Sequence, residues 1–229
     1  FVTGVIHGNW TDKQAKESIS IILNSLGSQP LRESDRYEQI VEVLQPGERI
    51  QFTREVGDNN NSLSYAIQVG EKDLKLIAMS SIIGSIVEND FYTQMRTNQQ
   101  LGYIVWSFQQ RTEKRLFFRF LIQSSTHGPF EMSKRVNAWL ESTDKIFSQL
   151  SDKEFEKHQQ AKIVALEKKG DSLGAVLGDL YSLATDEEGD FRFKNKLINT
   201  IKKLSKEDVA AKARELFLNP KTPRLEVLM

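Results

Sequence analysis

The sequence predicts an α+β domain with a mostly antiparallel sheet and helices packed on one face. Short runs rich in Val, Ile, Phe and Tyr fill the first half of the chain, and turn residues separate them, as is typical of antiparallel strands. After Pro129 the apolar residues recur at helical spacing almost to the end. No repeat, low-complexity tract or flexible linker interrupts residues 1–229, so we expect a single domain.

A short strand and a helix are expected at the start of the chain. Residues 1–7 are rich in β-forming side chains and end at a Gly-Asn turn. Thr11 and Gln14 have the spacing of a capping box, which predicts the start of a helix, and Gly27 would end it. Along this helix the apolar residues recur at spacings of three and four: Ala15, Ile19, Leu23 and Leu26.

Three strands are predicted next, at residues 37–44, 49–56 and 62–69, and we expect them to be antiparallel. The third alternates apolar and polar residues, which indicates one buried face. A mostly apolar helix follows over residues 73–88. Its small residues would let another element approach closely; they are Ala78, Ser80, Ser81, Gly84 and Ser85.

This helical stretch is expected to continue through residues 91–100 and to stop at Gly102, because glycine suits the left-handed turn that closes a helix. Two further strands are predicted at residues 103–110 and 115–124. One face of the second strand is continuously apolar: Leu116, Phe118, Phe120 and Ile122.

The second half of the chain is predicted to be helical. Helices are expected at residues 130–149, 151–169, 173–187, 194–203 and 205–217. Ser151 with Glu154, and Ser205 with Asp208, mark two of the helix starts. Residues 224–228 form a last strand.

Composition and motifs exclude several kinds of function. Lys plus Arg and Asp plus Glu both number 31, so no nucleic-acid partner is expected, and no apolar run predicts a membrane span. There is no cysteine, nucleophile elbow or P-loop. The three histidines, His7, His127 and His158, lie outside any zinc motif, and Glu154 with His158 reads as a surface pair. No metal site is expected in this chain.

Arg96 and Tyr103 form the most informative pair. They are seven residues apart, close to two helical turns, so they start on nearly the same side. Gly102 would let the chain turn and bring Tyr103 back toward the helix end. Converging Arg and Tyr side chains are good donors to a peptide carbonyl or an oxyanion. By the pattern alone a structural role is favoured, in which the Arg stacks on the Tyr or caps carbonyls.

The segment from Arg96 to Tyr103 resembles the R-T-x-x-Q-L-G-Y segment of pitrilysin and insulin-degrading enzymes. Flanking stretches agree in type and order over essentially the whole chain: residues 5–9, 104–105, 121–124, 151–169 and 204–217. The resemblance implies the C-terminal, fourth domain of a zinc metallopeptidase of the inverzincin kind. Because the chain opens at Phe1 without an initiator Met, we expect a fragment of a larger multi-domain polypeptide.

The resemblance also implies how such a domain functions. Zinc would be held in the N-terminal half of the same polypeptide, this chain's expected partner, and peptides would be the substrates. Tyr103 would hydrogen-bond the scissile carbonyl and its oxyanion, while Arg96 would bind substrate backbone or support Tyr103. Phe91 and Tyr92 would line a side-chain pocket. The isolated chain is not expected to be active, and bacterial relatives together with the lack of Cys favour a periplasmic location.

Two other functions stay open at this point. A relative of the same fold that has lost its metal would be a non-catalytic partner or structural subunit, and Arg96 and Tyr103 would then be structural. A peptide-binding α+β domain of unrelated function is the third possibility. An H-x-x-E-H motif in the parent reading frame would favour the enzyme.

Overall fold

A computed structural model describes residues 4–27, 32, 35 and 41–229. The chain divides into two compact units. The smaller unit comprises residues 1–40 and 167–195, and the larger comprises residues 41–166 and 196–229. That the whole chain is one domain stays a prediction.

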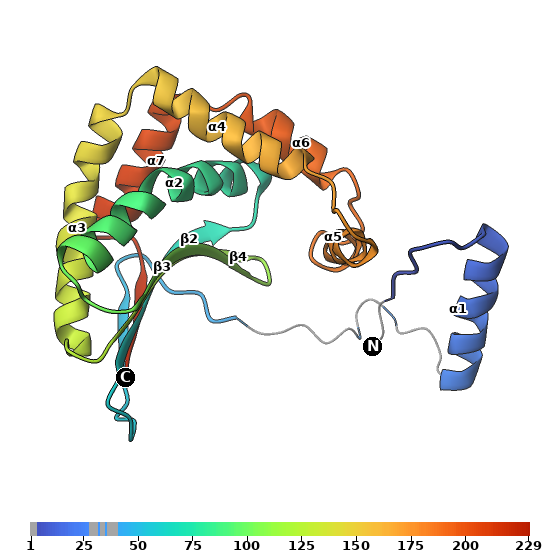
Figure 1. The fold of residues 1–229 in the computed structure, drawn as a ribbon, viewed down its shortest axis with the longest axis horizontal. Coiled ribbons are helices and arrows are strands. Elements are labelled where there is room, and N and C mark those ends of the chain that lie inside the picture. The colour runs from blue at the N-terminus through green and yellow to red at the C-terminus, as the bar shows by residue number, and fades with distance from the viewer. Residues whose placement is uncertain (1–3, 28–31, 33–34, 36–40) are drawn as a thin grey trace. The chain divides into compact units, whose positions relative to one another are not determined.

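The α+β fold class is confirmed (Figure 1). In chain order the elements are α1 (Asp12–Leu26), β1 (Arg49–Thr53), β2 (Asn61–Glu71), α2 (Leu74–Tyr92), the π-helix η2 (Thr93–Asn98), β3 (Ile104–Thr112), β4 (Arg115–Ser124), α3 (Pro129–Gln149), α4 (Asp152–Glu167), α5 (Leu173–Thr185), α6 (Phe193–Ile201), α7 (Lys206–Leu218) and β5 (Arg224–Leu228). The five helices predicted for the second half of the chain are therefore present.

The described sheet has the strand order β1-β5-β2-β4-β3. Three of its four pairings are antiparallel, and only β1 and β5 run parallel. The prediction that residues 49–56 and 62–69 form antiparallel strands is confirmed in direction, since β1 runs parallel to β5 and β5 runs antiparallel to β2. The two strands are not neighbours, because β5 lies between them. A strand that arrives from the far end of the chain leaves no signal in the local pattern.

Two expected strands are not observed. Residues 4–7 form no strand, and residues 1–3 lie outside the described part of the chain. Likewise residues 41–44 are irregular, while the rest of the strand predicted at 37–44 is not described. Leu44 is nevertheless buried, and its backbone N–H and C=O both bond the side-chain amide of Gln68 on β2.

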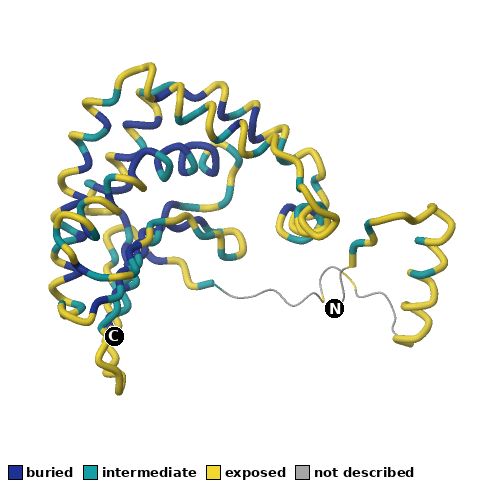
Figure 2. Tube along the Cα trace, in the orientation of Figure 1, coloured by how far each residue is buried: buried dark blue, intermediate teal, exposed yellow. Residues whose placement is uncertain are grey.

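One face of the sheet carries the core of the larger unit, beneath α2, α3 and α7 (Figures 1 and 2). The apolar face predicted on β4 is confirmed, since Phe118, Phe120 and Ile122 are all at most 1% exposed. The Phe120 ring centroid lies 5.3 Å from that of Trp139 on α3. Burying such a side chain stabilises the fold by about 1.5–3 kcal/mol, and this cluster fixes the helices on the sheet.

The small residues of α2 admit two neighbours, as predicted. From β3 the side-chain amide of Gln109 donates to the carbonyl of Ser80, and a Cβ on Gly84 would lie 2.4 Å from the same amide nitrogen. From α4 the Nδ1 atom of His158 lies 2.6 Å from the Ser85 hydroxyl. Larger side chains on this face would push β3 and α4 away.

In the smaller unit, α1 begins as the sequence predicts. Thr11 and Gln14 exchange the hydrogen bonds of a capping box, and Gly27 ends the helix with a left-handed φ of 58°. No residue of α1 is buried, and most of its residues are exposed (Figure 2). None of the helices in the described part of the chain is long and apolar enough to span a membrane.

Candidate functional site

The site begins where α2 passes into the π-helix η2. The Gln99 N–H donates to the Gln94 carbonyl over 3.0 Å, a bond that spans five residues. Met95 and Leu101 are fully buried and hold both ends of this turn in the core. Short π-helical turns are rare and occur frequently at functional sites. The helical continuation predicted through residue 100 is thus present, but in a geometry that sequence periodicity did not indicate.

The turn that follows is closed by Gln100, not by Gly102. Gln100 has a φ of 52°, a left-handed conformation that is uncommon for a residue with a side chain. Gly102 is required for another reason, because a Cβ there would lie 1.9 Å from the carbonyl oxygen of Gln123 on β4. The prediction placed the glycine correctly and assigned it the wrong physical cause.

Arg96 and Tyr103 converge as their spacing predicts. The Nη1 atom of Arg96 donates to the Gly102 carbonyl at 2.9 Å and also to the Tyr103 carbonyl. The Arg96 guanidinium carbon lies 4.7 Å from the centroid of the Tyr103 ring and 5.9 Å from that of Tyr92. A guanidinium near an aromatic face is attracted by the ring quadrupole. One cation therefore holds both the backbone and the ring of Tyr103.

Tyr103 is open to solvent. The residue is 84% exposed, and its hydroxyl has no hydrogen-bond partner among the described residues. Tyr92 is 46% exposed, and Arg96 is partly buried near both rings. The arrangement presents a free phenolic donor on a fixed cationic support, which can bind a carbonyl oxygen or an anion.

Phe91 does not reach this surface. It is fully buried, and its ring centroid lies 4.9 Å from those of both Phe120 and Trp139. The expectation that it lines a side-chain pocket is wrong, because its side chain belongs to the core beneath the site. Helical periodicity around a turn of this kind does not separate a buried aromatic residue from its exposed neighbour.

A hollow of about 430 Å³ adjoins the start of β3. It is lined by Val56, Asp58, Asn60, Ser62, Ile104, Leu121, Ile122, Gln123 and Met229. Ile104 directly follows Tyr103 and pairs with Gln123 on β4. The lining comes from four separate stretches of the chain, so no sequence motif could have revealed it.

The described residues do not fit a zinc ion. No group of three His, Cys, Asp or Glu side chains among them could hold a metal. The His127 Nδ1 atom lies 2.9 Å from the Thr126 hydroxyl, and His158 contacts Ser85. Glu154 accepts hydrogen bonds from Ser151, so the expected Glu154–His158 pair is not a bonded one.

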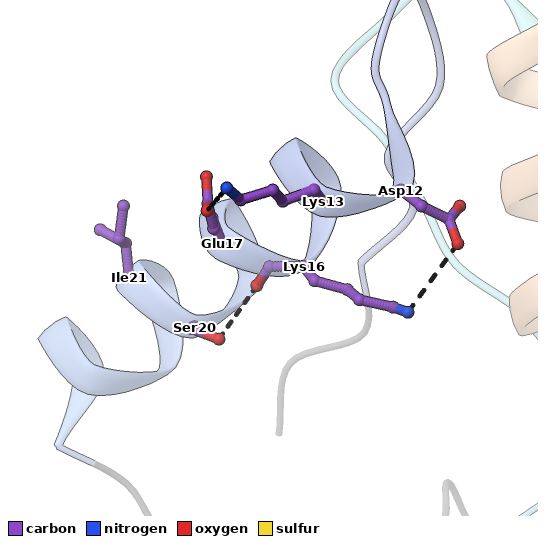
Figure 3. Close-up of a pocket in the computed structure, with 6 residues that line it drawn as sticks. All are labelled: Asp12, Lys13, Lys16, Glu17, Ser20 and Ile21. Atoms are coloured by element: carbon purple, nitrogen blue, oxygen red, sulfur yellow. Dashed lines mark hydrogen bonds and ion pairs between the residues drawn. The ribbon is translucent and has the colours of Figure 1, made fainter.

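A further hollow on α1 offers no site. It is lined by Asp12, Lys13, Lys16, Glu17, Ser20 and Ile21, all from one helix (Figure 3). The ion pairs Lys13–Glu17 and Lys16–Asp12 span 3.8 Å each between exposed side chains, where such pairs are worth little. No second wall faces this helix among the residues that line the hollow.

Comparison with known proteins relates this geometry to a family. A nardilysin-like protein of Arabidopsis thaliana is 28% identical over 99% of this chain. Insulin-degrading enzyme of Homo sapiens is 25% identical over 94% of it. The family model for the C-terminal lobe domain 4 of PqqF-like PQQ synthases matches residues 82–180, which include the end of α2 and the segment from Arg96 to Tyr103. Over nearly its whole length the chain is therefore similar to peptidases of the pitrilysin and insulin-degrading kind.

The fold is similar to that of a solved peptidase structure. The crystal structure of pitrilysin matches 97% of the chain with a TM-score of 0.82 at 23% identity, and the chain covers 24% of that structure. It likewise spans 23% of the nardilysin-like protein and 22% of insulin-degrading enzyme. The chain is thus similar to about a quarter of each of these longer proteins, and its described residues include no metal-binding group.

Proposed function

We propose that this domain acts as the fourth domain of a zinc metalloendopeptidase, in which Tyr103 donates a hydrogen bond to the scissile carbonyl of a bound peptide. The same donor would stabilise the oxyanion that develops from that carbonyl. The observation that carries the proposal is the exposed, unpartnered Tyr103 hydroxyl on a ring held against Arg96. A donor fixed in advance needs no reorganisation when charge appears, and this is what makes such groups effective.

Arg96 would act mainly through Tyr103. Its Nη1 atom donates to the carbonyls of Gly102 and Tyr103, which ties the guanidinium to the backbone of Tyr103. The guanidinium also adds positive charge beneath the phenol, which favours an anionic oxygen at the hydroxyl. We assign Arg96 as a positioning residue and Tyr103 as the group that touches substrate.

Tyr92 is the remaining candidate for contact with a substrate side chain. It is about half exposed and lies on the same guanidinium as Tyr103. The hollow beside Ile104 would offer a second wall on the other side of Tyr103. Peptide substrates suit a site that offers a carbonyl donor beside apolar surface.

Zinc would be supplied by the N-terminal half of the parent polypeptide, since the described residues of this domain do not fit the ion. In this proposal the parent polypeptide brings the metal and Tyr103 to one peptide bond. A periplasmic location stays a prediction, because no described feature of the chain bears on it.

The test is the Tyr103→Phe variant of the parent enzyme. Phenylalanine keeps the ring over Arg96 and removes only the hydroxyl, so we expect kcat for peptide cleavage to fall by about 10²–10³-fold with a much smaller change in KM. Tyr181→Phe is the matched control, because it removes an exposed phenolic hydroxyl on α5 that has no part in the proposed site. Its kcat should stay within about twofold of the wild type.

A Tyr103→Phe enzyme that turns over peptides at the wild-type rate would remove the role proposed for the hydroxyl. In that event a non-catalytic subunit of the same fold, in which Arg96 and Tyr103 only shape the surface, would be the better description.

A further inference from the structure

A pocket of about 370 Å³ lies in the larger unit, away from Tyr103. It is lined by Val69, Ile77, Ser80, Ser81, Gln109, Arg111, Leu116, Phe117, Lys162, Ala165, Leu166 and Leu197. These residues come from β2, α2, β3, β4, α4 and α6. Its volume falls in the range of small-molecule sites, which is about 300–1,000 Å³. Most of its walls are aliphatic or aromatic.

A polar group without a partner is buried against this pocket. Ser80 is 3% exposed, and its hydroxyl has no hydrogen-bond partner among the described residues. The neighbouring Ser81 hydroxyl, in contrast, donates to the Ala78 carbonyl at 2.8 Å. Leaving a buried hydroxyl unpaired costs about 1–3 kcal/mol. Such a group in the wall of a cavity points to a ligand that supplies the missing partner.

The charges that line the pocket have one sign. Lys162 and Arg111 are both cationic, and no Asp or Glu is among the lining residues. Lys162 forms no ion pair with any described residue. On the same helix, α4, the charge of Lys162 helps to lower the pKa of His158. An anion at this position would be the first counter-charge that Lys162 meets.

We propose that this pocket binds a small organic anion with an apolar body, of the class of short-chain or branched carboxylates. The carboxylate would bond Lys162 at the partly exposed mouth, and the aliphatic part would lie against Ile77, Leu116 and Leu166. A polar atom of the ligand or a water carried with it would satisfy Ser80. A free fatty acid and the C-terminal residue of a peptide both present this chemistry.

The site is independent of the proposed catalytic function. Gln109 and Arg111 lie six and eight residues beyond Tyr103, toward the far end of β3. At about 3.3 Å per residue this places their backbones roughly 20–26 Å along the strand from that of Tyr103. Failure of either proposal would leave the other intact.

Isothermal titration calorimetry of the intact protein tests the proposal with two probes. Octanoate represents a fatty acid, and N-acetyl-leucine represents a peptide C-terminus; 1-octanol and N-acetyl-leucinamide are their uncharged counterparts. We expect at least one acid to bind with a Kd on the order of millimolar or below. Its uncharged counterpart should bind at least about tenfold more weakly, because a hydrogen bond to a charged group is lost.

Variants locate the binding. Lys162→Met should weaken the acid at least about tenfold, whereas Lys153→Met, an exposed lysine on the same helix outside the pocket, should leave it unchanged. Ser80→Ala should weaken binding while leaving the melting temperature of the free protein unchanged or higher, because the hydroxyl it removes has no partner. A merely structural Ser80 would lower it instead.

Whichever acid binds identifies the source of the ligand. The proposal is overturned if neither acid binds, if acids and uncharged counterparts bind equally, or if Lys162→Met and Lys153→Met behave alike.

Discussion

The Arg96 guanidinium combines two contacts that a lysine could not reproduce together. Its Nη1 atom bonds two successive carbonyls, and its central carbon lies 4.7 Å from the Tyr103 ring centroid. Lysine carries the same charge on a point-like ammonium without a planar fork, so Arg96→Lys keeps the charge and loses the geometry. This substitution therefore separates positioning from simple electrostatics.

We expect Arg96→Lys to lower kcat of the parent enzyme by about tenfold, with a smaller change in KM. If Arg96 acts through the phenol, the substitution should have almost no further effect in a Tyr103→Phe background. A double-mutant cycle of kcat/KM values measures this directly. Fully additive losses would show instead that Arg96 contacts substrate independently.

Gly102 is constrained by packing. An added Cβ would lie 1.9 Å from a backbone oxygen of β4, which has no flexible side chain to move aside. We expect Gly102→Ala to lower the free energy of unfolding by about 2–4 kcal/mol. Urea unfolding measures the loss. Gly178→Ala is the control: open space surrounds that helical position, and alanine there should be neutral or stabilising by up to about 1 kcal/mol.

For single residues, the sequence predicted which positions are important more accurately than it predicted the role of each. The seven-residue spacing correctly brought Arg96 near Tyr103, because both follow one helical segment. The burial of Phe91 and the left-handed φ of Gln100 depend on the core and on the π-turn, which no local pattern encodes.

A histidine on α4 forms a contact between the helices α2 and α4. The His158 Nδ1 atom lies 2.6 Å from Ser85 on α2. Burial lowers the pKa of His158 below its ordinary value; Glu154 on the same helix opposes this shift, and Lys162 adds to it. The neutral imidazole is thus the form that suits the interface.

The sign of the pH dependence follows from that shift. As pH falls below about 6.5, the unfolded chain takes up a proton on this histidine before the folded one does. The contribution of His158 to stability is present above that pH and is lost as pH falls toward the folded pKa. We expect urea unfolding to show a weaker loss of stability between pH 7 and 5 in His158→Gln than in the wild type. Identical slopes would contradict the assignment.

Helices and strands differed in how much of them could be predicted. The capping box at Thr11 and the cap at Ser205 are local, and both helices begin where these residues indicate. The parallel pairing of β1 with β5 joins residues that are far apart in the sequence, such as Arg49 and Arg224. It depends on how the whole sheet assembles. Alternation identifies a buried face but does not name the neighbouring strand.

Across the whole larger unit, the last strand is tied to the core by Arg224, a residue to which no sequence motif drew attention. It is 5% exposed. Its guanidinium donates to the Tyr65 hydroxyl at 2.7 Å, to the Phe217 carbonyl at 2.7 Å and to the Asn137 side-chain oxygen at 3.0 Å. These partners lie on β2, α7 and α3, so one side chain joins β5 to the layers that enclose the core.

Removing that guanidinium should weaken the larger unit as a whole. Arg224→Met keeps a side chain of similar length but leaves the Phe217 carbonyl without its buried donor, while the Asn137 oxygen retains only the Tyr65 hydroxyl. We therefore expect the free energy of unfolding to fall by about 2–4 kcal/mol. Burying the charged guanidinium itself costs free energy, and its Nε atom has no partner among the described residues. Removing that cost offsets part of the loss. Arg49→Met is the matched control, because Arg49 pairs with Arg224 across the parallel strands and is exposed. Urea unfolding should give that control a free energy of unfolding within about 0.5 kcal/mol of the wild type. Equal losses in both variants would mean that any Arg→Met change in these paired strands destabilises the protein, and that the buried hydrogen bonds of Arg224 are not the cause.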